Sequence, residues 1–283
     1  MTDPMPIPAA GKAVLLEDLR RRIRRLEGTA GEGGRVLPLG PALGAALPEG
    51  GLPLGCLHEV SAGTGPGEDP WGGAATGFAA ALAGRIAALH GPVLWVRRAE
   101  ARRGAAEPYA PGLAAWGLGP ERLIVVRARA EAEILWALEE ALRCRGLGAV
   151  LAEVDGIDAT AGRRLQLAAE AGGVTALLLR LGRRRAPASA AVTRWAVSAA
   201  PGRVVRTPDG ADEPGVGAPR WRVELLRCRG GRPGVWLAEW RGEDFAAEIL
   251  EGAILEGAIL EGAGKDGIGR PDGRQPARAG LSS

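Results

Sequence analysis

Five short apolar runs, separated by stretches with helical periodicity, constrain the fold of this 283-residue chain more than any other feature. Each run has the length of a buried strand, and they occupy residues 55–60, 92–96, 123–126, 149–154 and 174–181. Helical patterns fill the intervals, at residues 78–89, 113–119, 130–145 and 159–171. Buried strands that alternate with helices are typical of βαβ units, which build a parallel sheet. We therefore predict an α/β fold with a mainly parallel sheet flanked by helices.

A different pattern follows the fifth run. Residues 193–199 and 221–228 have the composition of strands, the sequence GGRPG at 230–234 predicts a turn, and residues 235–240 return as a strand. These signals predict an antiparallel hairpin extension at one edge of the sheet, which is a common form of mixed sheet.

Composition divides the chain into three parts. Residues 1–36 combine a disordered start, an amphipathic helix and a Gly-rich linker, residues 37–245 form the core domain, and residues 246–283 are of low complexity and are predicted to be disordered. The tail carries EGAIL twice in tandem at 251–260, a period that fits neither a helix nor a strand. We interpret the repeat as a duplication without structural role; the alternative is a frayed helix that binds a partner.

The amphipathic helix is predicted over residues 12–27. Leu15, Leu19, Ile23 and Leu26 recur at three- and four-residue spacing, and Arg20, Arg21, Arg22, Arg24 and Arg25 occupy positions between them. Two interpretations stay open for this stripe. It packs on its own core, or it docks on another protomer or a partner and so supports self-association.

Charge and cysteine usage exclude several classes of protein. The net charge of +3 permits a DNA partner without demanding one, and nearly all of the basic charge is arginine. Cys56, Cys144 and Cys228 are too widely spaced for a disulfide framework or a CxxC metal site, so we expect buried, reduced thiols. The sequence has neither a signal peptide nor a run of ~20 apolar residues, which predicts a cytoplasmic protein without membrane contact.

A Gly-rich loop at residues 61–77 joins the first strand to the following helix, which is the context of a phosphate-binding P-loop. A P-loop also needs a lysine for the β/γ-phosphates and a Ser or Thr for Mg²⁺. The segment with Gly72, Gly73, Thr76 and Gly77 offers a hydroxyl but no cation, and the only lysines are Lys12 and Lys265. The loop therefore predicts a fold like that of an ATPase, in a chain that lacks the catalytic lysine at this position.

The remaining parts of an ATPase site are also incomplete. Glu153 or Asp155, at the end of the fourth strand, stands where Mg²⁺ would be coordinated, although such carboxylates are also common without metal. The second strand continues into Arg97 and Arg98, so the usual water-activating glutamate is missing. We predict no catalytic residue, no cofactor and no metal; weak nucleotide binding stays an alternative.

His58 and Glu59 end the first strand and could be interpreted as acid/base machinery. Adjacent strand residues point to opposite faces, so the two side chains should not converge on one substrate atom. We expect a structural strand end with one polar side chain turned outward.

The chain resembles the ImuA family, RecA-like proteins of bacterial damage-induced mutagenesis cassettes, over roughly residues 37–240. The motifs that carry the resemblance, in order, are LPLGCLHEV, GFAAALAGRIA, GPVLWV, YAPGLAAWGL, ERLIVVRA, LWALEEALR, TAGRRLQLAAEAGG, TRWAV and RWRVELLRCRGGRPGVWLAEW. The resemblance implies a RecA-like core and an accessory role in translesion synthesis. It also implies two partners: ImuB, a catalytically inactive relative of Y-family polymerases, and an error-prone replicative-type DNA polymerase.

In a RecA-like core, a DNA-contacting loop follows the fifth strand, where this chain carries Arg183, Arg184 and Arg185. These arginines could track phosphates, which would give a weak DNA contact, or they could belong to a solvated loop. The sequence as a whole favours a non-catalytic adaptor. The alternatives are a nucleotide-binding RecA-type ATPase and a regulator of another protein, either a RecA antagonist or a SulA-like inhibitor of cell division.

Overall fold

The computed structural model describes residues 35–63, 72–99, 107–181, 189–207, 209, 212–214 and 217–250. These residues belong to one compact unit, Met1–Ala253, and the second unit, Ile254–Ser283, lies outside them. Four predicted features also lie outside the described residues. They are the helix at 12–27 with its stripe of Leu15, Leu19, Ile23 and Leu26, the middle of the Gly-rich loop, the Arg183–Arg185 loop and the EGAIL repeat.

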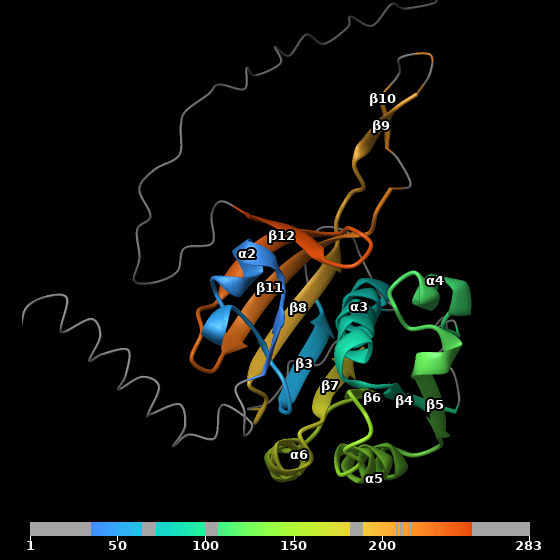
Figure 1. The fold of residues 1–283 in the computed structure, drawn as a ribbon, viewed down its shortest axis with the longest axis vertical. Helices are drawn as coiled ribbons and strands as arrows, with labels where there is room; N and C mark the ends of the chain where they lie inside the picture. The colour runs from blue at the N-terminus through green and yellow to red at the C-terminus, as the bar shows by residue number, and fades with distance from the viewer. Residues whose placement is uncertain are drawn as a thin grey trace, which may run out of the picture. The chain divides into compact units, whose positions relative to one another are not determined.

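A nine-stranded sheet forms the centre of the fold (Figure 1). In spatial order its strands are β13 (Phe245–Ile249), β12 (Gly234–Trp240), β11 (Arg220–Cys228), β8 (Thr193–Ala199), β3 (Leu57–Ala62), β7 (Thr175–Arg180), β6 (Ala149–Val154), β4 (Val93–Arg98) and β5 (Leu123–Ala128). The strands from β8 to β5 pair in parallel, and β11, β12 and β13 continue the sheet in antiparallel fashion. The predicted RecA-like α/β architecture with an antiparallel extension is confirmed.

Helices cover both faces of the parallel part (Figure 1). On one face lie α3 (Gly73–His90), α4 (Ala110–Ala114), α2 (Gly40–Gly44) and the small sheet of β1 (Val36–Pro38) and β2 (Gly51–Pro53). On the other face lie α5 (Glu131–Leu142) and α6 (Ala159–Gly172). Short 3₁₀ turns at Pro48–Gly50 and Pro120–Arg122 precede β2 and β5, and β9 (Val204–Arg206) pairs with β10 (Asp212–Pro214).

Several predicted boundaries differ from the structure. The helix expected at residues 113–119 is α4 at Ala110–Ala114, and the first strand, expected at 55–60, is β3 at Leu57–Ala62, so His58 and Glu59 lie near its start. The helix expected at residue 78 begins at Gly73, because Gly72 adopts a left-handed conformation (φ 70°) that starts the helix there. The core does not end at residue 245, because β13 continues to Ile249 and pairs with β12. The stretch 246–249, which we predicted to belong to the disordered tail, is therefore part of the sheet.

The core under α3 is rich in aromatic rings. Phe78 of α3 contacts Trp195, Trp221 and Phe245, with centroid distances of 5.9, 6.0 and 5.3 Å. Such tilted and edge-on contacts add to the stabilisation from burial alone. They join α3 to the antiparallel strands β11 and β13, so the parallel and antiparallel parts share one core.

The face under α5 and α6 is aliphatic, and these two helices approach each other closely. A Cβ on Gly172 would lie 1.9 Å from the carbonyl oxygen of Leu142, so only glycine fits there. None of the described helices combines the length and the apolar character needed to cross a membrane.

Candidate functional site

The carboxyl edge of the parallel strands is where open α/β sheets bind ligands, and the degenerate P-loop lies at this edge. Residues 64–71 of the loop are outside the described part of the chain, but both of its ends are described. At the first end, the backbone N–H of Gly63 donates to the carbonyl of Val197 on β8 (2.7 Å). That N–H therefore extends the sheet and does not point into a phosphate cradle.

At the second end, the loop closes onto its own helix. Both the backbone N–H and the hydroxyl of Thr76 donate to the carbonyl of Gly72, each at 2.8 Å. Leu181, which follows β7, lies so close that a Cβ on Gly72 would be 2.5 Å from its Cδ2 atom. The start of α3 thus faces an apolar side chain where a P-loop helix would face phosphate.

No cation from α3 takes the place of the missing lysine. Arg85, the only arginine of this helix, donates to the carbonyl of Pro38 and to the carboxylate of Asp244 (2.7 Å). Burial lowers the pKa of Arg85, and Asp244 opposes this shift by favouring the charged form. The guanidinium serves to tie α3 to β1 and to the turn before β13.

Glu153 is paired with an arginine. At the ends of the neighbouring strands β6 and β4, Arg97 Nε donates to Glu153 Oε1 (2.6 Å), and both side chains are largely buried, 8% and 13% exposed. Arg97 also donates to Glu107 (2.8 Å) and lies over the ring of Trp95, 5.5 Å from its centroid. A metal ion at Glu153 would have to displace a held guanidinium, which a partly buried site makes costly.

Asp155, the second candidate for metal binding, belongs to a separate cluster. Arg98 NH2 donates to Asp155 Oδ2 (2.6 Å) and also to Glu131 at the start of α5. Arg97 and Arg98 are adjacent in β4 and so hold the two carboxylates on opposite faces of the sheet. Among the described residues, no group of three or more His, Cys, Asp or Glu side chains could hold a metal ion.

His58 and Glu59 are both buried, so the expectation that one of them turns outward is wrong. His58 Nε2 lies 2.8 Å from the carbonyl of Pro53 and Nδ1 lies 2.7 Å from the hydroxyl of Thr193. Trp195 Nε1 donates to the same hydroxyl (2.7 Å), so this hydroxyl donates its own proton to His58 Nδ1. His58 Nε2 then donates to Pro53, and a neutral imidazole satisfies every partner. Burial lowers the pKa of His58 to about 4.

Glu59 lies on the opposite face, in a pocket of polar groups. Ser189 Oγ donates to it (2.5 Å), Arg194 Nε lies 3.1 Å away, and Arg180 NH1 lies at 3.9 Å. The expectation that His58 and Glu59 do not converge is thus met. Sequence reasoning missed this cluster, because its members come from β3, β7, β8 and the segment before β8 and share no local spacing.

The cysteines form no reactive centre in the described part of the chain. Cys56 Sγ lies 3.4 Å from His58 Nε2, but burial raises the pKa of the thiol well above its usual range, so it stays protonated. Burial raises the pKa of Cys228 as well, to about 11. All three cysteines are free thiols, but only Cys56 is buried; Cys144 is exposed and Cys228 half-buried, contrary to the expectation that all are buried.

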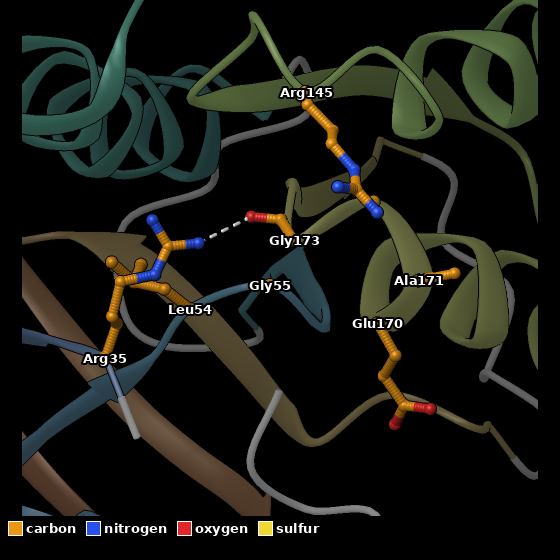
Figure 2. Close-up of a pocket in the computed structure, with 8 residues that line it drawn as sticks. Arg35, Leu54, Gly55, Arg145, Glu170, Ala171 and Gly173 are labelled. Carbon is orange, nitrogen blue, oxygen red and sulfur yellow. Dashed lines mark hydrogen bonds between the residues drawn. The ribbon is translucent and has the colours of Figure 1, made fainter. Parts of the chain in front are cut away.

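A cavity of about 200 Å³ lies at the amino edge of the parallel strands, away from the P-loop (Figure 2). Arg35 NH2 donates to the carbonyl of Gly173 (2.9 Å), and Arg145 and Glu170 also line the cavity. Figure 2 shows the carboxylate of Glu170 turned away from the guanidinium of Arg35. With one arginine already bound to the backbone, this cavity offers no assembled catalytic or phosphate site.

Two curated proteins are similar to this chain over most of its length. Protein ImuA of Caulobacter vibrioides strain NA1000 / CB15N is 46% identical over 216 residues, which cover 72% of this chain and 83% of that protein. Protein ImuA of strain ATCC 19089 / CIP 103742 / CB 15 gives the same values. No family model matches the chain.

Proposed function

Because the chain belongs to the ImuA family, we propose that it acts in damage-induced mutagenesis as a non-hydrolysing RecA-like adaptor. In this role it scaffolds an ImuB-type protein and an error-prone replicative-type DNA polymerase during translesion synthesis. Family membership supports the link to the mutagenesis cassette. The adaptor role and the two partners are our proposal.

The pairing of Arg97 with Glu153 is the observation that carries the non-hydrolysing role. Phosphoryl transfer needs cationic groups at the transferred phosphate, a metal carboxylate and a residue that positions water. Here the Gly-rich loop has no cation, and Glu153, the candidate metal carboxylate, is bound to the guanidinium of Arg97. Arg97 itself stands at the strand end where a water-activating glutamate would be expected.

Two alternative functions make different demands. A nucleotide-binding RecA-type ATPase needs a phosphate cradle, against which the Leu181 contact at Gly72 argues. A regulator, such as a RecA antagonist or a SulA-like inhibitor of cell division, could use the same fold without catalysis. Only the identity of the partner separates a regulator from an adaptor.

Capture of partners from damaged cells tests the adaptor role. We expect the tagged full-length chain to retain an ImuB-type protein and a polymerase. Recovery of RecA alone or of a cell-division protein would instead support a regulator. The Arg143→Ala variant, which removes an exposed arginine of the α5 surface, serves as a matched control for nonspecific loss of binding.

Measurement of ATP turnover tests the second half of the proposal. The purified chain should hydrolyse no ATP above background, with or without single-stranded DNA, because loss of the lysine and of the metal carboxylate each costs orders of magnitude in rate. Turnover that disappears in Glu153→Gln would contradict a non-hydrolysing role.

A further inference from the structure

The strand β5 forms a free edge of the nine-stranded sheet. It pairs with β4 from Leu123 to Ala128, and no other described strand pairs with its outer side. Figure 1 shows β5 at one end of the sheet, beside α4. Within the described ranges, its outward backbone N–H and C=O groups therefore have no strand partner, and a further strand could pair with them.

This edge is apolar where most free edges are protected. Ile124 and Val125 are 48% and 45% exposed, although both are β-branched residues in the middle of a strand. A cavity of about 530 Å³ lies beside Val125, lined also by Leu113 and Leu123, with Glu107 and Arg127 among its polar groups. Natural proteins usually protect such an edge with charges, proline or a bulge, whereas residues 123–126 of β5 are all apolar, which indicates a pairing surface.

The charges at the two ends of β5 indicate what pairs with it. Glu121 precedes the strand and Arg127 lies near its end, with side chains 68% and 58% exposed. The contact of Arg127 with Glu107 (3.3 Å) is solvent-exposed and therefore easily exchanged for another carboxylate. Because the strand carries Glu121 at its start and Arg127 near its end, opposite charges meet when two copies of it pair antiparallel.

We propose that β5 pairs antiparallel with β5 of a second copy of this chain, with the two-fold axis at Ile124. In this register Ile124 faces Ile124 of the second copy once, on the axis, while Leu123 faces Val125 and Glu121 faces Arg127, and each of these two pairs is formed twice. Residues directly opposite each other share a face in an antiparallel pair, so these contacts occur together. A parallel pairing would instead set like charges side by side.

A second copy fits this edge better than a strand of another protein. A two-fold axis makes the same patch serve on both sides, and the patch is self-complementary in both charge and apolar character. The register also places Arg122, 44% exposed, opposite Val126 and away from other arginines. The sheet would continue from one copy into the other.

Disulfide trapping tests the register. In an antiparallel pair, opposite Cα atoms lie about 4.5–5.5 Å apart, which a disulfide can span. Under mild oxidation, Ile124→Cys in a Cys144→Ser background should give a covalent dimer on a non-reducing gel. Leu89→Cys in the same background, a more exposed site on α3, should give no covalent dimer. Equal cross-linking of both variants would overturn the register.

Substitutions in β5 test whether the partner is a second copy, with the oligomeric state of the full chain measured by sedimentation or light scattering. We expect a dimer that Val125→Lys abolishes and that Glu121→Arg weakens by about tenfold, because two attractive pairs become repulsive. The double variant Glu121→Arg with Arg127→Glu should restore it. Leu19→Asp with Ile23→Asp should leave the dimer intact; its loss would assign self-association to the amino-terminal stripe.

Three results would overturn the proposal. They are a monomeric wild-type chain at all concentrations, a dimer that survives Val125→Lys, and a double reversal that does not recover association. If the wild-type chain is monomeric but Val125→Lys abolishes capture of the polymerase partners, the edge receives a strand of another protein. Melting curves of each variant would show that the fold is retained.

Discussion

The guanidinium of Arg97 and the carboxylate of Glu153 meet at 2.6 Å across two adjacent strand ends. Arg97→Ala should leave this carboxylate largely buried and unpaired, and lower the free energy of unfolding by about 3 kcal/mol. Chemical denaturation would measure it. Arg143→Ala, at an exposed pair on α5, is the control and should cost less than 1 kcal/mol. If both variants lose the same free energy of unfolding, the Arg97–Glu153 pair stabilises the fold no more than an exposed pair does.

A tight contact between α3 and the turn after α4 gives a second prediction. A Cβ on Gly84 would lie 1.7 Å from the carbonyl oxygen of Trp116, so Gly84→Ala must push the two backbones apart. We expect a loss of stability of about 2–3 kcal/mol, visible as a lower melting temperature. Gly112→Ala, where the nearest side-chain atom of Tyr109 is 3.5 Å away, should be neutral within about 1 kcal/mol.

The pH dependence of stability should report on His58. Its pKa falls to about 4 in the folded protein, while an unfolded histidine has its ordinary value of 6.5. Below pH 6.5 the unfolded state takes up a proton that the folded state refuses, so stability declines as the pH falls toward 4. This difference corresponds to about 3 kcal/mol in full.

Urea denaturation between pH 4 and 8 would measure this decline. The variant His58→Asn removes the titrating group, so its stability should change less over the same interval. Identical pH profiles for the two proteins would exclude His58 as the source.

The loop with Arg183, Arg184 and Arg185 lies outside the described residues, and its DNA contact stays a prediction. Phosphate contacts should dominate, with a log–log salt slope of roughly −0.7 per phosphate neutralised on single strands. Replacing all three arginines with alanine should flatten the slope by up to about two units. Fluorescence anisotropy across a salt series would measure it, with the triple variant Arg122→Ala, Arg143→Ala and Arg164→Ala, at three exposed arginines, as a control for total charge. An unchanged slope would identify a solvated turn.

Local pattern predicted the elements well but placed some of their ends wrongly. The helix α3 starts five residues earlier than its apolar run, at Gly73, because the left-handed Gly72 precedes it. The strand β13 lies in a segment that reads as a low-complexity tail, and only its pairing with β12 makes it a strand. The first difference depends on the backbone conformation of one neighbouring glycine, and the second on a strand pairing outside the local window.

The amino-acid sequence by itself determined that buried strands alternate with helices and that the Gly-rich loop has no lysine, because apolar periodicity and residue identity are local properties. Only the tertiary structure decided which strand ends meet. The strand β6 pairs with β4 and leaves β5 at the edge, although β5 precedes β6 in the chain. That order brings Arg97 to Glu153 and exposes Ile124, because non-local packing of the crossover helices, and not spacing along the chain, sets which strands are neighbours.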